Sequence, residues 1–202
     1  MANANKPNGF TPVRYLNGAP WTGASNTYSI AASYGTILRI GDPVISSGTS
    51  DTNGVAGIAL GATTGALRGV IVGLGKYEGS AGFNPSNLDI TYRPAGDPSV
   101  WYAQVVDDPN VIFSIQEHTG TTQLAATEVG LNQIGYSGST TTYTSDWQLA
   151  CYSDATPNTT ATLQLRLLGL VRTPDNAFGA YAKWLVQINV HELAHGTGAA
   201  GA

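Results

Sequence analysis

The chain has 202 residues, of which 42% are hydrophobic and only 11% are charged, and its formal net charge is -4. An ordinary soluble protein has about 25% charged residues, so the polar surface here must come mainly from Thr, Ser, Asn and Gly. Nine Lys and Arg residues spread along the chain form no basic patch that could follow a phosphate backbone. No apolar run approaches the ~20 residues that a membrane-spanning helix needs. The composition therefore argues against nucleic acid and membranes as partners.

The N-terminal segment, residues 1–25, is expected to be an extended arm. Pro7, Pro12 and Pro20 interrupt it, and such a segment gains order only by lying on another surface. Alternatively, the arm folds back onto the protein's own sheet and covers an edge. The opening residues lack the basic and apolar regions of a secretory signal, so we expect assembly in a cytoplasm. Residues 26–202 are expected to form a single β-rich domain.

The remainder of the chain has the composition of an all-β protein, because 25 Gly and 10 Pro separate short segments rich in Val, Ile, Tyr and Thr. We expect strands at Thr36–Ile40, Val55–Leu60, Arg68–Leu74, Val100–Val106, Val111–Gln116, Trp147–Cys151, Leu163–Val171 and Tyr181–His191. Residues 41–54 and 136–146 have the composition of polar loops. One short helix is expected within Gln123–Leu131, with Thr121 or Thr122 as its cap.

The C-terminal strand leads into His191-Glu192-Leu193-Ala194-His195, which matches the H-E-x-x-H signature of zinc peptidases. That signature requires a helix, because only there do residues i and i+4 reach one metal ion. Polar and apolar residues alternate up to the motif, as in a strand, and in an extended chain the two histidines would stand roughly 13 Å apart. The seven residues after the motif offer no third ligand. We therefore interpret the motif as a strand end, with a zinc peptidase as the alternative.

The other residues that could have a chemical function are equally well explained by structural roles. Asp107 and Asp108 precede Pro109-Asn110 in a turn sequence, although a weak calcium site remains an alternative. Cys151 has no basic residue or His beside it in the sequence and is interpreted as a small core residue. No motif indicates a cofactor, a metal ion or an enzymatic activity, and we expect none.

Three stretches of the sequence resemble the cement, or decoration, proteins of tailed bacteriophage capsids. They are ANANKPNGFTPVRYLNGAPWTGA, VWYAQVVDDPNVIFSIQ with the later Gly130-Leu131-Asn132, and AKWLVQINVHELA. IGDPV at residues 40–44 and GVIVG at residues 69–73 extend the likeness over most of the chain. The resemblance implies a jelly-roll-like fold, self-association as a homodimer in preference to a trimer, and attachment to the outer capsid surface across joints between major capsid proteins.

Candidate contact residues follow from composition, because Tyr, Trp and Arg are enriched at protein interfaces. In the arm and in the central strand, the candidates for contacts with the capsid or with a second copy are Phe10, Arg14, Tyr15, Trp21, Trp101 and Tyr102. An alternative function with the same kind of surface is a virion adhesin that binds host glycans through exposed Tyr and Trp.

Overall fold

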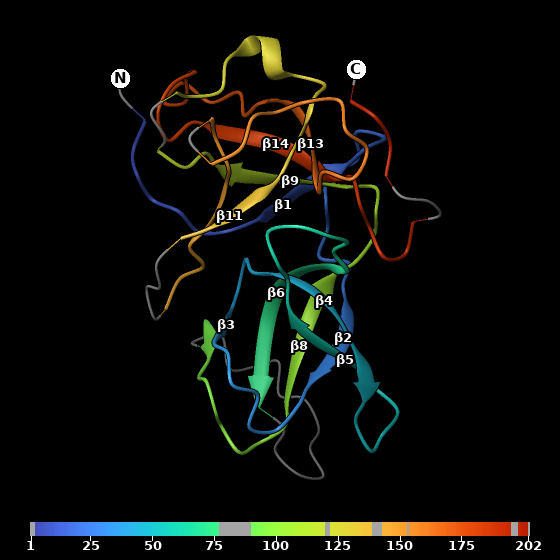
Figure 1. Ribbon diagram of the computed structural model, residues 1–202. Coiled ribbons are helices and arrows are strands. Elements are labelled where there is room, and N and C mark those ends of the chain that lie inside the picture. Colours follow the sequence, from blue (N-terminus) through green and yellow to red (C-terminus); the bar gives the residue numbers. More distant parts are fainter. Residues whose placement is uncertain are drawn as a thin grey trace.

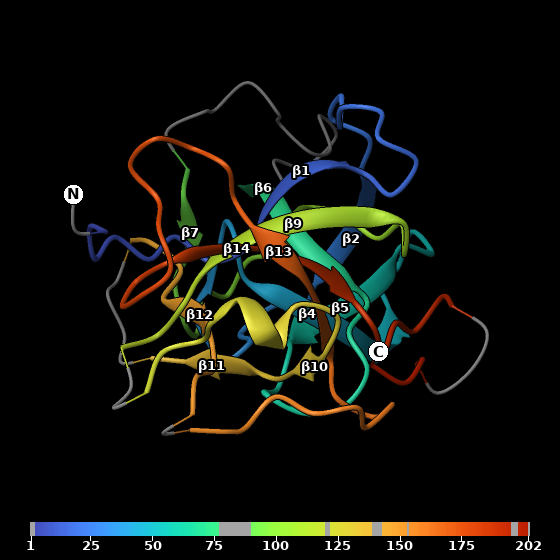
Figure 2. The same cartoon turned by 90° about the horizontal axis from the view of Figure 1, so that it is seen from above.

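The computed structural model describes residues 3–76, 90–119, 122–138, 143–152, 154–194 and 198–201. Its strands fall into two units, drawn one above the other in Figure 1 and seen along the perpendicular direction in Figure 2. One unit is a closed barrel, and the other is a five-stranded sheet with a small two-stranded sheet beside it. Within the described part of the chain, no helix has the length and hydrophobicity required to span a membrane.

The barrel closes in the order β2-β5-β4-β6-β8. Its strands are β2 (Asn26–Ile30), β4 (Pro43–Ser50), β5 (Ala56–Leu60), β6 (Gly69–Lys76) and β8 (Trp101–Val106). All pairings are antiparallel except the short parallel contact between β2 and β5. Closure leaves no free sheet edge in this unit. The barrel interior is a core of buried aliphatic and aromatic side chains that includes Ile30, Val44, Ile71 and Val105.

The second unit is an antiparallel sheet in the order β1-β9-β14-β13-β10. Its strands are β1 (Thr11–Tyr15), β9 (Val111–Gln116), β10 (Asn132–Gln133), β13 (Leu165–Leu170) and β14 (Lys183–Ile188). The smaller sheets are formed by β11 (Gly135–Ser137) with β12 (Trp147–Leu149), and by β3 (Leu38–Arg39) with β7 (Tyr92–Arg93). The core of this unit also includes Val70 and Val106 from β6 and β8 of the barrel. The two units are therefore joined by a shared apolar interior.

The all-β class expected from the sequence is confirmed, and each of the eight expected strand segments contains a strand. The strand at Val111–Gln116 has the expected bounds, because a continuous buried run follows directly after a turn sequence. The expected helix is reduced to a single 3-10 turn, η2 (Ala126–Glu128). Glu128 accepts a hydrogen bond from the backbone N–H of Ala125, so the turn is capped at Ala125 and not at Thr122, while Thr121, the other expected cap, lies outside the described residues. The jelly-roll character implied by the resemblance stays a prediction.

The prediction of a polar loop over residues 41–54 is wrong for its central part, which is β4. Pro43 and Val44 are buried and pair with β6, while the exposed polar half of the strand pairs with β5. Ser46 and Ser50 both pair with β5, with a register shift between them where Gly48 has a φ of 76°. Side-chain composition does not reveal such pairing. Part of the second predicted loop likewise pairs with β12 as β11.

The N-terminal arm lies on the protein's own sheet, which is the alternative considered for it. Residues 11–15 form β1 and pair with β9 at the edge of the sheet. Closer to the N-terminus, the backbone N–H of Lys6 donates a hydrogen bond to Gln116 (3.0 Å), and Gln116 donates one to the carbonyl of Ala4 (3.2 Å). The arm is therefore ordered by the chain itself, and only its outward face is left for another molecule.

Candidate functional site

No helix follows β14 at the described motif residues, His191-Glu192-Leu193-Ala194. The strand ends at Ile188, and His191 forms an isolated parallel bridge with Leu67. The backbone of Leu67 donates to Val190 and accepts from Glu192, each at 2.9 Å. The backbone N–H of Ala194 returns to the carbonyl of His191 in a turn. His195 lies outside the described residues, but the bridge at His191 and the turn that begins at Glu192 do not form the helix on which the zinc signature depends.

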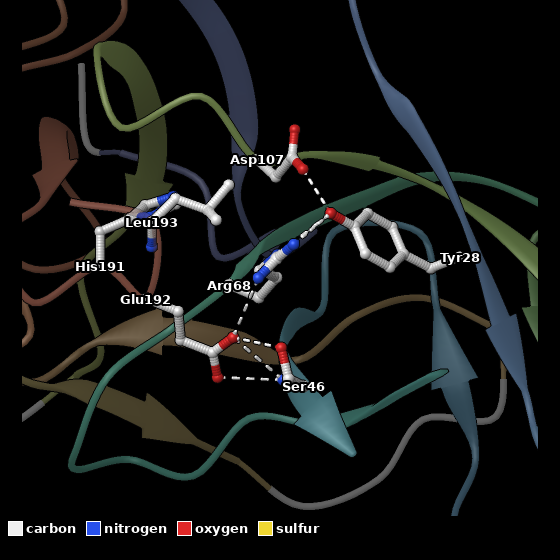
Figure 3. A network of polar contacts seen from close by, with 7 residues as sticks. All are labelled: Tyr28, Ser46, Arg68, Asp107, His191, Glu192 and Leu193. Atoms are coloured by element: carbon white, nitrogen blue, oxygen red, sulfur yellow. Dashed lines mark hydrogen bonds and ion pairs between the residues drawn. The ribbon is translucent and has the colours of Figure 1, made fainter. Parts of the chain in front are cut away.

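The carboxylate of Glu192 is held by the barrel (Figure 3). It accepts hydrogen bonds from the backbone N–H of Ser46 at 3.0 Å and from the hydroxyl of the same residue. An Arg68 nitrogen lies 3.7 Å from Oε2 of Glu192, the oxygen that accepts from the Ser46 hydroxyl. Arg68 in turn donates two hydrogen bonds, at 3.0 and 2.9 Å, to the hydroxyl of Tyr28, which donates to Asp107. We call Ser46, Arg68, Tyr28, Asp107 and Glu192 the junction network, because it connects the segment after β14 to the barrel.

His191 is buried, with 3% of its surface exposed. Its Nδ1 accepts a hydrogen bond from the backbone N–H of Leu193 at 3.0 Å, which places the proton of the neutral ring on Nε2. Burial lowers the pKa of His191, so the ring is held neutral. In the described part of the motif, Glu192 is therefore engaged with the barrel and His191 packs inside the protein. The geometry supports a structural role for both.

Three of the six predicted contact residues are buried by the protein itself. Phe10 packs edge-to-face against Phe113, with ring centroids 6.1 Å apart, and is 2% exposed. Trp101 is buried in the barrel core. The Tyr102 hydroxyl donates to Asp51 at the barrel end. We therefore correct the prediction that Phe10, Trp101 and Tyr102 contact a partner, because their apolar surface is already buried by folding.

The other three predicted contact residues lie in or just after the edge strand β1, where Tyr15 and Trp21 also pack against the core of the sheet unit. Arg14, Tyr15 and Trp21 are each partly exposed, and the turn after β1 brings Pro20 back to form a bridge with Arg14. Two neighbours that the sequence did not single out, Val13 and Leu16, are 40% and 52% exposed. We call these residues, Val13–Leu16 and Trp21, the arm strip. It is a partly apolar surface with one cationic side chain.

A groove of about 420 Å³ adjoins the arm strip between the two units. It is lined by residues from the arm and from four other segments, among them Pro12, Trp21, Ile40, Val72 and Tyr143. Tyr143 is 64% exposed and meets Tyr92 edge-to-face at 5.1 Å. We call this the junction groove. No sequence signal pointed to Ile40 or Tyr143, because the groove exists only where the arm passes the barrel.

The paired acidic residues of the turn before β9 have separate roles. Asp107 is buried and accepts hydrogen bonds from Tyr28 and Asn26. Asp108 is exposed and accepts from the backbone N–H of Asn110 at 2.8 Å, as in an Asx turn. The turn prediction is confirmed, and each carboxylate has a local structural partner.

Comparison with known proteins adds no identification. No protein-family model, curated protein or solved structure matches the chain. The function is therefore argued from the residues and their geometry, together with the resemblance noted in the sequence.

Proposed function

We propose that the protein is a structural component of a phage virion, a cement protein that binds the outer surface of the head across joints between major capsid proteins and stabilises the shell. The observation that carries the proposal is the arm strip beside the junction groove. The arm strip lies wholly within residues 8–21, and the same segment supplies five of the twelve residues that line the groove; it belongs to the first of the stretches that resemble cement proteins. The same face thus combines sequence likeness with an exposed apolar surface.

The low charge of the surface favours broad contacts over electrostatic attraction. Of the nine Lys and Arg residues, Arg39 and Arg93 are buried, which further reduces the charge available outside. A neutral surface rich in Thr, Asn and Gly forms hydrogen-bonded, hydrated interfaces. Each such contact is weak, but a molecule that touches several capsid subunits at once binds tightly because later contacts are intramolecular.

The partners in this proposal are the phage major capsid protein and a second copy of this chain, as a homodimer. The arm strip is the surface for the capsid. Nothing in this function requires a cofactor, a bond-making step, nucleic acid or a membrane. The protein would assemble in the host cytoplasm and reside on the outside of the virion.

A second candidate function, a virion adhesin for host glycans, is favoured by one observation. The exposed ring of Tyr143 and the partly exposed Trp21 line the same groove, and sugar rings pack on aromatic faces. The two functions differ in ligand, so a single set of variants separates them.

The test measures saturable binding to capsids that lack this protein, together with the temperature at which the shells rupture. The variants are Leu16→Asp in the arm strip and Tyr143→Ala in the groove. The matched control is Val129→Asp, because Val129 is similarly exposed, at 43%, but lies after η2, next to the opposite edge strand β10.

The proposal expects the wild-type protein and the Val129 control to bind and to raise the rupture temperature equally. Leu16→Asp should weaken binding by about tenfold or more, since it places a charge inside an apolar contact. Absence of capsid binding by the wild type would overturn the proposal. Glycan binding that is lost in Tyr143→Ala, without any effect of Leu16→Asp, would favour the adhesin.

A further inference from the structure

His118, Cys151 and Asp154 bring three potential metal ligands together on the sheet unit. One ligand atom from each residue lies within 4.8 Å of the other two. The Nδ1 atom of His118 is 3.0 Å from an oxygen of Asp154, and the sulfur of Cys151 is 3.7 Å from the same oxygen. No sequence motif indicates this cluster, because 33 positions separate His118 from Cys151.

The backbone holds the three side chains in place. His118 is the second residue after the end of β9, and its N–H donates to the carbonyl of Leu149 at 2.9 Å. Cys151 and Asp154 share one turn, in which the backbone N–H groups of Asp154 and Ala155 both donate to the carbonyl of Cys151. The imidazole of His118 is also stacked on the ring of Tyr136, 3.9 Å between centroids. The ligands are thus positioned by secondary structure, a turn and an aromatic contact.

Two of the three separations between these atoms are close to those around a tetrahedral metal ion, and the third, between the His118 nitrogen and the Cys151 sulfur, is at most 4.8 Å. With bonds of about 2.0 Å to nitrogen and oxygen and about 2.3 Å to sulfur, neighbouring ligand atoms stand roughly 3.3–3.6 Å apart. The two observed distances differ from that range by only a few tenths of an ångström. A thiolate with an imidazole and a carboxylate is a donor set that favours zinc over the hard ions calcium and magnesium.

We propose that His118, Cys151 and Asp154 form a zinc-binding site, with the fourth position open to water. The side chains of His118 and Asp154 are each 22% exposed, which lets an ion enter from solvent. Cys151 is fully buried, so the sulfur can serve a small ion but cannot reach a substrate carbon as a nucleophile. The ion would tie the segment after β9 to the turn after β12. This site is independent of the arm strip and of the proposed cement function.

Zinc binding at this site should stabilise the folded protein, because the unfolded chain does not hold the three ligands together. With free zinc at 100 times the dissociation constant, we expect the melting temperature of this chain to rise by about 5–10 °C. The same experiment on a variant that lacks one ligand should give a much smaller rise.

The experiment uses the full-length protein without a histidine tag, kept reduced, and titrates it with zinc against a chromophoric chelator. Cobalt(II) is then bound in place of zinc, because a thiolate ligand gives it a sulfur-to-metal charge-transfer band. The variants are His118→Asn and Asp154→Asn, whose partly exposed positions preserve the core, and Cys151→Ala. Asp175→Asn is the control, since Asp175 is exposed and distant in sequence from the cluster.

The wild type and the Asp175 control should bind one equivalent of zinc and show the charge-transfer band with cobalt. Each ligand variant should lose affinity by more than about 100-fold, the upper range for changes to groups that only support a ligand. Melting in the presence of chelator identifies any variant that is misfolded. The proposal is overturned if the wild type binds no zinc, if the His118 and Asp154 variants bind it as well as the wild type, or if cobalt binds without the thiolate band.

Discussion

Glu117 should make the stability of the fold depend on pH. Its side chain is fully buried next to the sheet core, where Trp184 donates a hydrogen bond to one carboxyl oxygen (2.9 Å) and the backbone N–H of Leu124 donates to the other (3.0 Å). Burial raises the pKa of Glu117 from 4.5 to about 7, although both hydrogen bonds favour the charged form. The folded protein therefore retains a proton that the unfolded chain releases at lower pH.

The sign and size of the effect follow from this difference in pKa. Between pH 4.5 and about pH 7 the folded state binds more protons than the unfolded state at Glu117, so the free energy of unfolding falls as pH rises. At about 1.4 kcal/mol for each pH unit between the two pKa values, the loss amounts to about 3 kcal/mol. Below pH 4.5 this group stops contributing to the slope.

The assay is urea denaturation of the wild type and Glu117→Gln at several pH values from 4 to 8, followed by tryptophan fluorescence. Glutamine keeps the shape of the side chain but does not titrate. Other groups therefore contribute equally to the pH dependence of both proteins. One such group is buried Asp42, whose pKa is raised to about 6. The stability of the wild type relative to the variant should fall by about 3 kcal/mol across this range. A difference that stays constant from pH 4 to pH 8 would refute the reasoning.

Two further substitutions separate core roles from surface roles, both measured by urea denaturation. Phe10→Ala should destabilise the protein by about 3–5 kcal/mol, because a buried ring is removed. Leu16→Ala, at an exposed position, should change stability by less than about 0.5 kcal/mol. Equal effects of the two substitutions would contradict the placement of the arm. Glu192→Ala removes the acceptor of the Ser46 N–H and should cost about 1–2 kcal/mol, with Glu192→Gln recovering part of the loss. A Glu192 variant with wild-type stability and a lost zinc-dependent activity would return the motif to the peptidase interpretation.

Local pattern was sufficient for most of the strands. The apolar run at Val111–Gln116 after the Asp-Asp-Pro-Asn turn predicts a strand with the bounds that the structure has. Alternation at Leu165 and Leu167 likewise predicts which side chains of β13 are buried. These features depend on neighbours within a few residues, which the sequence displays directly.

Elements whose order depends on distant partners were not predictable in the same way. β4 is polar over much of its length and becomes a strand through pairing with β5 and β6. Phe10, Trp101 and Tyr102 are of residue types that are common at interfaces. Whether such a ring faces a core or a partner depends on tertiary packing, which residue type does not encode. Of the contact candidates, Arg14, Tyr15 and Trp21 remain at the surface.

The sequence by itself determined that this protein is all-β, weakly charged and divided by regular turns, because those properties reside in residue type and short-range alternation. Only the tertiary structure decided which groups Glu192 and the single cysteine contact. Glu192 meets Ser46 across 146 positions, and Cys151 meets Asp154 and His118 only after β9 and β12 have been brought together. Side-chain chemistry depends on which groups converge in space, and that convergence is set by strand register and packing over the whole chain.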